Sequence, residues 1–247
     1  MSETATDLRT LSTCANGEAD ELRRAWDRRL QSAPSLQLPA RRTVVVVPHP
    51  DDESLSSGGL IMHQLARGVP VVVVAVTDGE AAYSTWPHPG LAAIRRDEQR
   101  TALKILGVPV SATVRLGLPD SALVTHGDEL VDRLDAIIEP DDVVVAPWVH
   151  DWHPDHVACG RAAQHVAASH RCTLFGSLFW ALHHIDPRDH PDAAFATLAL
   201  TDDERLWRRE ALRSHRSQFD PCDHLPILDQ SLIDHLHSPI EQYVVSA

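Results

Sequence analysis

Short apolar runs alternate along most of the chain with stretches that have the apolar spacing of a helix. The runs predict strands over 43–47, 71–77, 112–116, 142–146 and 173–180. The intervening stretches predict helices over 54–68, 91–106, 130–138 and 156–168. Strands that alternate with helices imply βαβ crossovers and a mostly parallel sheet. We therefore expect an α/β fold, Rossmann-like, with helices flanking the sheet.

The two ends of the chain have a different pattern. Residues 1–17 read as a loose arm, 18–30 as a polar helix, and 32–42, with two prolines, as a linker. The part after 180 is less regular and predicts helices over 202–214 and 229–237. This divides the chain into an N-terminal arm, helix and linker over 1–42 and a single catalytic α/β domain over 43–247.

Composition excludes several classes of protein. The formal net charge of −13 argues against a nucleic-acid partner, which requires a basic face. No apolar stretch reaches the roughly 18 residues of a membrane span, and the N-terminus lacks the pattern of a signal peptide. The four cysteines are scattered without a CxxC pair, so they predict neither a disulfide scaffold nor a thiolate metal site. A cytoplasmic protein with no membrane partner is the expectation.

The sequence Pro-His-Pro-Asp-Asp-Glu, residues 48–53, directly follows the predicted strand 43–47. Ligands of open α/β sheets bind at this carboxyl edge. Three acids and an imidazole in so short a segment repel one another unless a positive group neutralises them. A divalent metal ion is the simplest such group.

A second cluster, His153-Pro-Asp-His156, follows the strand 142–146 and again opens a helix. The two clusters converge if their strands are neighbours in the sheet. Together they would suit a zinc-type ion with three protein ligands and one open position. Helix capping is the alternative for each cluster alone, but it does not account for both at equivalent places in the topology.

This pair of motifs resembles the LmbE-like, or PIG-L, family of metal-dependent N-deacetylases. Four further segments resemble family motifs: Thr77-Asp-Gly-Glu80, the Arg95-to-Gly107 helix with Glu98, Gly117-Leu-Pro-Asp120, and Ser214-His-Arg-Ser-Gln218. The resemblance covers residues 43–219. It implies an LmbE-like fold and hydrolysis of the acetamide of an N-acetylglucosamine-type compound.

Carried over to this chain, the resemblance implies His49, Asp52 and His156 as ligands of Zn²⁺, with Fe²⁺ or another divalent ion also compatible. Asp51 would be the general base that accepts a proton from the attacking water. His153 would stabilise the oxyanion or protonate the leaving nitrogen. Asp155 would orient His153 and hold it as imidazolium, with a helix N-cap as its alternative role.

Three residues are candidates for substrate binding. Arg95 could hold sugar hydroxyls or a phosphate, or instead form an ion pair with Asp97 or Glu98. Asp120 could contact sugar hydroxyls or shape a turn, and Trp86 could stack on a sugar or lie free in a surface loop. The roles of Glu53, His183, His184 and His215 stay open. Some family members have a tyrosine where this chain has Asp151, which removes one oxyanion donor.

Two rival functions remain. The first is amide cleavage of a larger conjugate, as in amidase members of the family. The second is a non-catalytic sugar- or nucleotide-binding domain, although a Gly-x-Gly-x-x-Gly turn does not follow the first strand. The expected partner is a small amino sugar, and the sequence leaves open whether the chain forms a homo-oligomer.

Overall fold

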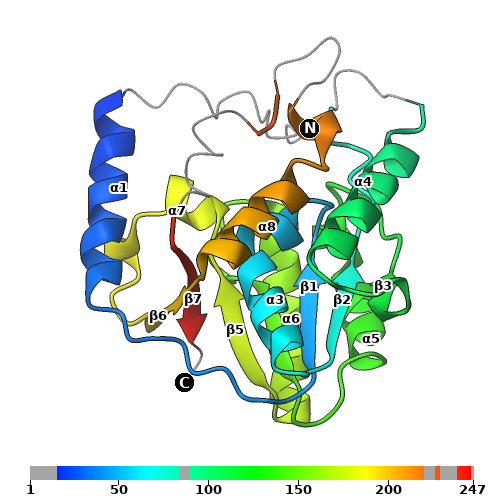
Figure 1. Ribbon diagram of the computed structural model, residues 1–247, viewed down its shortest axis with the longest axis horizontal. Coiled ribbons are helices and arrows are strands. Elements are labelled where there is room, and N and C mark those ends of the chain that lie inside the picture. The colour runs from blue at the N-terminus through cyan, green and yellow to red at the C-terminus, as the bar shows by residue number, and fades with distance from the viewer. Residues whose placement is uncertain (1–15, 84–88, 220–225, 229–237, 246–247) are drawn as a thin grey trace.

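The structure is a computed structural model that describes residues 16–83, 89–219, 226–228 and 238–245, with side chains from residue 20. In this part of the chain the strands form one seven-stranded sheet of order β3-β2-β1-β4-β5-β7-β6 (Figure 1). The strands are β1 (Thr43–Val47), β2 (Val71–Ala75), β3 (Thr113–Arg115), β4 (Val143–Pro147), β5 (Thr173–Ser177), β6 (Phe195–Ala199) and β7 (Ile240–Val245). Strands β1 to β5 pair in parallel, and β7 runs antiparallel to β5 and β6. The predicted α/β fold with a mostly parallel sheet is confirmed.

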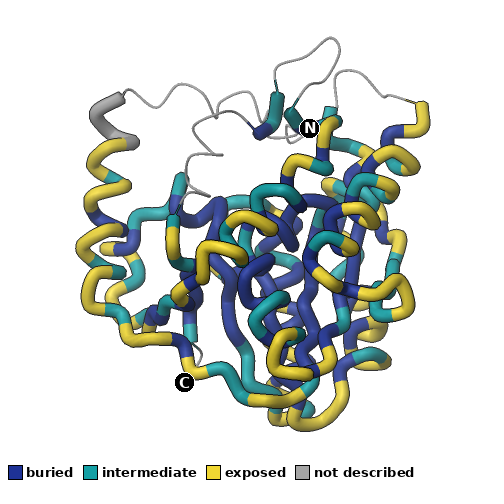
Figure 2. Tube along the Cα trace, in the orientation of Figure 1, coloured by how far each residue is buried: buried dark blue, intermediate teal, exposed yellow. Residues whose placement is uncertain are grey.

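Helices cover both faces of this sheet. They are α1 (Asn16–Gln31), α2 (Asp52–Ser56), α3 (Gly58–Ala66), α4 (Leu91–Ile105), α5 (Gly127–Asp135), α6 (Pro154–His170), α7 (Trp180–His184), α8 (Asp202–Leu212) and α9 (Arg216–Phe219). Short 3₁₀ helices span Val110–Ala112, Leu123–His126 and Pro187–Asp189. Because side chains alternate along a strand, Val45 packs with apolar residues of α3, α4 and α8, while Val44 packs with those of α5 and α6. Strands β1 and β4 are therefore buried along their whole length, and Figure 2 shows the buried residues concentrated in the centre of the sheet.

Strand β1 lies at the point where the order of the sheet reverses. From β1 the chain passes to β2 and β3 on one side, whereas β4 and β5 lie on the other side. The pairing of β1 with β4 sets Val45 opposite Val145, so both strands end at the same edge. Such a switch point opens a crevice at the carboxyl ends of the strands. The two sequence clusters at 48–53 and 153–156 meet there.

The predicted helix 54–68 is two helices, α2 and α3, that separate at Ser57. The buried carboxylate of Glu241 accepts hydrogen bonds from the amides of Gly59 (2.6 Å) and Leu60 (2.9 Å). An acidic group at these amides satisfies donors that a helix start leaves unpaired, so it stabilises a new helix there. The prediction of one helix was wrong because this partner lies far away in the sequence, on β7.

The C-terminal part also contains strands that the sequence pattern did not predict, β6 and β7. Strand β7 buries Glu241 and Gln242 beside its apolar residues. These polar residues interrupt the apolar run by which a buried strand is predicted from sequence. The predicted strand 173–180 ends at Ser177, and Trp180 begins α7. Helix α8 matches the prediction of 202–214 closely and begins with a capping box between Thr201 and Glu204. The predicted helix 229–237 lies outside the described residues.

Helix α1 packs against the sheet domain through its apolar side. Trp26 is buried in a cluster with Trp148, Leu178 and Phe195, and its indole N–H donates to the carbonyl of Ile185 at 2.9 Å. The linker that follows adds one bridge, between Ser35 and Thr197. These contacts hold the N-terminal helix beside α7, while the division of the chain at residue 42 stays a prediction.

The substitution Gly160→Ala on α6 tests the close approach of that helix to β4. A Cβ at Gly160 would lie 2.4 Å from the carbonyl oxygen of Pro147, a backbone atom that cannot move without disturbing the sheet. We expect a loss of about 1–3 kcal/mol in the free energy of unfolding, measured by denaturant titration. Gly127→Ala is the matched control, because a Cβ there meets nothing within 4 Å. Equal stability of the two variants would contradict the packing described.

Candidate active site

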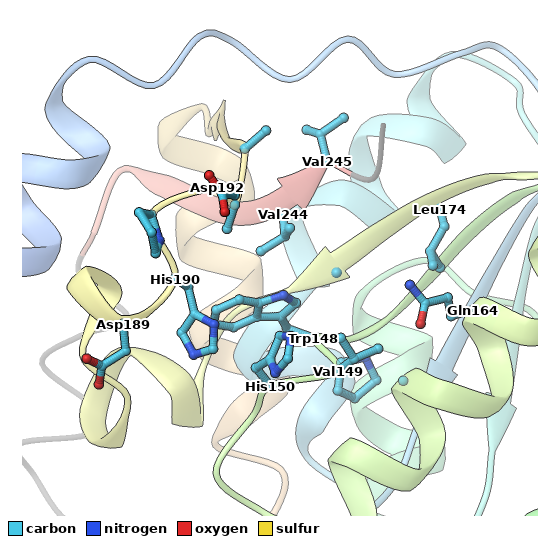
Figure 3. Close-up of a pocket in the computed structure, with 16 residues that line it drawn as sticks. Trp148, Val149, His150, Gln164, Leu174, Asp189, His190, Asp192, Val244 and Val245 are labelled. Atoms are coloured by element: carbon cyan, nitrogen blue, oxygen red, sulfur yellow. The ribbon is translucent and has the colours of Figure 1, made fainter.

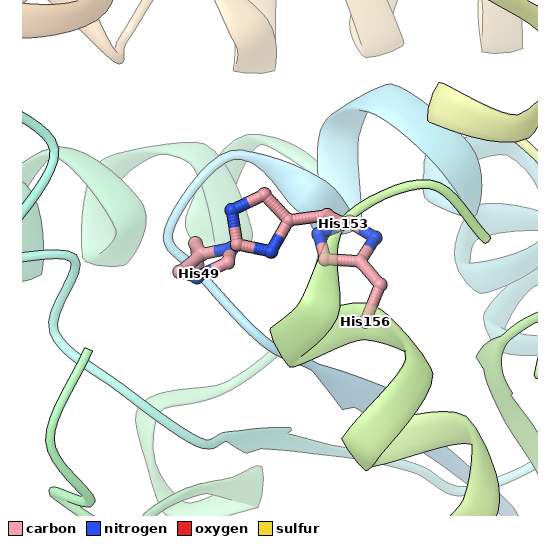
Figure 4. Close-up of side chains that lie close together, drawn as sticks. All are labelled: His49, His153 and His156. Carbon is pink, nitrogen blue, oxygen red and sulfur yellow. The ribbon is translucent and has the colours of Figure 1, made fainter. Parts of the chain in front are cut away.

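The three histidines of the two motifs gather at the switch point. Ring centroids are 4.8 Å apart for His49 and His153, 5.4 Å for His49 and His156, and 5.1 Å for His153 and His156. Figure 4 shows the rings converging from the turn after β1 and from the start of α6. Pro154 opens α6, and the side chain of His153 caps it. The cluster is therefore built from two rigid helix starts.

Asp52 lies between two of these imidazoles. Its Oδ2 is 3.4 Å from Nδ1 of His49 and 3.3 Å from Nε2 of His156. The backbone amide of His49 donates to the same oxygen at 2.9 Å, which holds the carboxylate in place. Nε2 of His156 is buried and has no hydrogen-bond partner in the described part of the chain. A buried nitrogen without a partner, beside a carboxylate and a second imidazole, is a donor set that fits a divalent ion.

The opposite nitrogens of these two histidines face carboxylates. Nε2 of His49 is 3.2 Å from Asp120 and 3.3 Å from Asp155, and Nδ1 of His156 is 3.6 Å from Asp151. A carboxylate on one ring nitrogen fixes the tautomer and leaves the other nitrogen available as a ligand. This arrangement directs Nδ1 of His49 and Nε2 of His156 toward Asp52, as the predicted ligand set requires.

Two groups of described side chains have the spacing of a metal site. One consists of His49, His153 and His156, and the other of His49, Asp120 and Asp155, with ligand atoms within 4.8 Å of one another. Both groups include His49. The described residues thus contain a candidate His/Asp metal centre at this edge of the sheet.

Electrostatics favour charge separation within this cluster. Burial opposes ionisation of Asp52, but His156 and His49 hold the pKa of that carboxyl well below its ordinary value. Burial likewise opposes a charge on His49, whereas hydrogen bonds with Asp120, Asp155 and Asp52 raise its pKa well above the usual range. A bound cation would take the place of the proton that these carboxylates favour.

Asp51 occupies a strained backbone conformation beside Asp52. Its φ is 115° and its ψ is −30°, a region that non-glycine residues rarely adopt. The Asp51 amide donates to Oε2 of Glu53 at 3.3 Å, which helps to hold this turn. Burial raises the pKa of Asp51 to about 7, with Arg95 opposing the shift and Asp52 adding to it. A carboxylate with a pKa near neutrality is suited to accept a proton.

Arg95, predicted to bind substrate, is buried and directs its guanidinium at the protein. It donates to Asp51 Oδ2 (3.1 Å), to the carbonyl of Pro50 (2.6 Å) and to the carbonyl of Gly79 (2.9 Å). A Cβ at Gly79 would lie 2.2 Å from Nη1 of Arg95, so only glycine permits this approach. The alternative pairing with Asp97 or Glu98 is replaced by the pair with Asp51. The contacts favour positioning of Asp51, and substrate binding by Arg95 stays a prediction.

The other two predicted substrate residues have different outcomes. Asp120 lines the same crevice, but its Oδ2 accepts from the amide of Ala81 at 2.8 Å and its Oδ1 faces His49. Its contacts are thus with the protein, and a contact with sugar stays a prediction. Trp86 lies outside the described residues.

The predicted link between Asp155 and His153 differs in the structure. The Asp155 carboxylate accepts from the amides of Ser121 (2.7 Å) and Leu123 (3.1 Å) and faces His49. The Asp155 amide instead donates to Nδ1 of His153 at 3.2 Å. Burial, with repulsion from His49 and His156, lowers the pKa of His153 to about 3. Because Nδ1 of His153 accepts this hydrogen bond, the proton of its imidazole lies on Nε2, and the effect of the Asp155 carboxylate on the charge of His153 stays a prediction.

Glu53 and His215 form a buried pair beneath the turn of Asp51. Nε2 of His215 lies 2.9 Å from Oε1 of Glu53, and Gln99 donates to Oε2 at 3.0 Å. Burial opposes both charges, but their attraction lowers the pKa of Glu53 and raises that of His215. Gln99 was not among the residues expected at this site. Its position four residues after Arg95, on the same face of α4, was the available signal.

A family model for PIG-L, described as GlcNAc-PI de-N-acetylase, matches residues 44–167, which include both motifs of this centre. The chain belongs to the PIG-L family. The resemblance seen in the sequence is thereby confirmed.

Among relatives of this PIG-L chain is the probable N-acetyl-alpha-D-glucosaminyl L-malate deacetylase 2 of Bacillus cereus. It is 34% identical over 136 residues, which cover 49% of this chain and 59% of that protein. The chain thus spans less than two thirds of that relative's length.

Two solved structures share the fold. One is the zinc-inhibited form of the teicoplanin deacetylase Orf2, with a TM-score of 0.66 and 19% identity, covering 82% of this chain and 97% of that chain. The other is the N,N'-diacetylchitobiose deacetylase of Pyrococcus horikoshii, with a TM-score of 0.62 and 22% identity, covering 100% and 95%. At these identities the likeness concerns the fold alone.

The centre of this PIG-L chain opens into a cavity of about 50 Å³. Its lining includes His49, Asp51, Asp52, Arg95, Asp120, His153, Trp152, Trp180 and Ile227. A larger cavity of about 400 Å³ lies elsewhere, around Trp148, His150 and His190 (Figure 3). None of the predicted site residues lines that larger cavity. The smaller cavity is therefore the candidate active site.

His183 and His184, whose roles the sequence left open, belong to no group with metal-site spacing within the described residues. His184 stacks on Trp152 with ring centroids 4.4 Å apart and an interplanar angle of 28°. Since Trp152 lines the cavity, His184 supports its wall from behind.

The substitution His215→Ala tests the buried pair with Glu53. It leaves an ionised carboxylate without its partner in a site from which water is excluded. We expect a loss of about 3–5 kcal/mol in the free energy of unfolding, measured by denaturant titration. His126→Ala, at a histidine that is more than a third exposed, is the control and should change stability little. A His215→Ala variant as stable as this control would contradict a charged pair.

Proposed function

We propose that this chain is a metal-dependent N-deacetylase that hydrolyses the acetamide of an N-acetylglucosamine-type compound. The observation that carries the proposal is that Asp51 and His153 line one cavity together with His49 and Asp52. A proton acceptor and a proton donor beside a candidate metal centre are what hydrolysis of an amide requires. The names of its relatives, a glucosaminyl malate deacetylase and a diacetylchitobiose deacetylase, support the same reaction class.

The ligands of the ion would be Nδ1 of His49, Oδ2 of Asp52 and Nε2 of His156. Two imidazoles and one carboxylate with an open position suit Zn²⁺, and they are also compatible with Fe²⁺. A divalent ion in this place lowers the pKa of a bound water and polarises a carbonyl oxygen. Asp120, Asp155 and Asp151 would orient the two imidazoles from behind.

Asp51 would accept the proton of the attacking water. Arg95 holds one of its oxygens, at 3.1 Å, and the strained turn fixes its direction. Positioning of this kind reduces the reorganisation needed when the proton moves. The Asp51 carboxyl would later return the proton toward the leaving nitrogen.

His153 would donate its Nε2 proton in a hydrogen bond to the oxygen of the tetrahedral intermediate. Its Nδ1 accepts from the Asp155 amide, which leaves Nε2 as the donor of a residue that lines the cavity. A donor aimed at developing negative charge is a large contribution to catalysis. This takes over the oxyanion contribution that a tyrosine at position 151 makes in some family members.

An amidase that cleaves a larger conjugate is the closest alternative, since the same residues would serve it. A panel of acetylated amino sugars and larger amide conjugates, assayed with the purified protein, separates the two. Release of acetate from the amino sugars supports the deacetylase. Cleavage of the larger amides alone would favour the amidase, and turnover of neither would favour a binding domain.

Removal of a ligand should abolish metal binding. We expect purified protein to hold one divalent ion per chain, and His156→Ala to lose it, as measured by elemental analysis and by calorimetric titration with zinc. His170→Ala on the same helix should keep the ion, because His170 pairs with Asp135 at the far end of α6. If the purified protein holds no stoichiometric metal and does not bind added zinc, the proposal of a metal-dependent enzyme is wrong.

Removal of the base should separate turnover from metal binding. We expect Asp51→Asn to keep its ion and to lose about 10²- to 10⁴-fold in kcat, the usual contribution of general acid–base catalysis. Asparagine retains the size of the side chain and tolerates positive φ. Steady-state kinetics and metal content are measured on one preparation, and full activity of Asp51→Asn would show that the base is another group.

A further inference from the structure

The cavity beside the metal centre has two chemically different walls. The acidic wall consists of Asp51, Asp52 and Asp120 together with the histidines, and the aromatic wall consists of Trp152, Trp180 and Ile227. Both walls line the same small space. A substrate whose acetamide faces the acidic wall must therefore place its remaining atoms against or near the aromatic wall.

The aromatic wall is supported from behind. Trp152 stacks on His184, and its ring centroid lies 6.4 Å from that of Trp180. Trp180 in turn belongs to a cluster with Leu55, Phe179, Leu212 and Leu228. Since this packing fixes both indoles, the wall is a preformed surface that costs little entropy to use in binding.

The charge of the cavity excludes one class of ligand. Asp52 and Asp120 line the cavity, and both already contact His49. Among the described residues of the lining, Arg95 is the one arginine and there is no lysine, and Arg95 already pairs with Asp51. No arginine or lysine of this lining is thus available to pair with an anionic substituent.

The formal net charge of the whole chain, −13, also disfavours the approach of an anion. An aglycone with carboxylates or phosphates would lose its hydration without gaining a partner.

We infer that the substrate is an amino sugar with an uncharged, apolar aglycone that lies against Trp152 and Trp180. This inference rests on the proposed deacetylase function and narrows it. The acetamide meets Asp51 and His153, and the aglycone lies against the indoles. Discrimination against anionic aglycones follows from the acidic wall, and preference for apolar ones follows from the aromatic wall.

The test compares three N-acetylglucosaminides that differ only in the aglycone: phenyl, methyl and a dicarboxylate. Acetate release by the metal-loaded enzyme gives kcat/KM for each. We expect the phenyl compound to exceed the methyl compound about three- to tenfold, as one aromatic contact predicts, and the dicarboxylate to fall below both. A dicarboxylate preferred over the phenyl compound would overturn the inference while leaving deacetylation intact.

Substitutions of Trp152 test whether this residue causes the preference for the phenyl compound. Trp152→Ala should raise KM for the phenyl compound about three- to tenfold, with a smaller change for the methyl compound, and Trp152→Phe should restore most of the difference. Trp207→Ala is the matched control, because Trp207 is half exposed on α8 and does not line the cavity. If Trp152→Ala raises KM equally for both compounds, Trp152 has only a structural role and the inference fails.

A binding measurement keeps this result separate from catalysis. Phenyl glucosaminide, the deacetylated product, is titrated into the intact protein and followed calorimetrically, with methyl glucosaminide as reference. We expect the phenyl compound to bind more tightly, and Trp152→Ala to remove the difference. If no acetamide is hydrolysed but this pattern of binding holds, the proposed function fails and the aromatic subsite stands. Equal binding of both compounds would overturn the subsite.

Discussion

The pairing of β1 with β4 is the constraint on which the rest of the structure depends. These strands are adjacent in the sheet although 95 residues of chain separate Val47 from Val143, and their pairing brings two polar turns to one edge. Parallel strands end on the same side, so each turn begins a helix beside the other. The crevice lies between these turns because β2 and β3, which follow β1 in the chain, lie on one side of β1, whereas β4 lies on its other side.

The crevice collects charges that could not be buried singly. Asp51 pairs with Arg95, Glu53 with His215, and Asp52 lies between two imidazoles. Each carboxylate loses its hydration free energy on burial, and the attraction to its partner offsets only part of that loss. This balance leaves His49 and His156 each within 3.4 Å of the Asp52 carboxylate. It is the reason why a cation fits there better than a further side chain.

The two walls of the cavity follow from the same topology. The carboxylates of the acidic wall come from the turns after β1 and β3, whereas Trp180 comes from α7 after β5. The loop after β4 supplies both Trp152 of the aromatic wall and His153 of the acidic wall. Both walls are thus built from loops at one edge of the sheet.

The sequence by itself determined the residue types of the site and the parallel sheet, because both depend on local patterns. The apolar run Thr43–Val47 predicts a strand that is buried on both faces. Acids and histidines close together in the sequence indicate a cation site. The choice of partners was decided only by tertiary structure. Glu241 divides a helix that lies 181 residues away, Asp155 faces His49 instead of His153, and Arg95 holds Asp51. A buried polar group bonds with a partner that the folded chain brings within hydrogen-bond distance. The periodicity of the sequence does not show which residues become neighbours in this way.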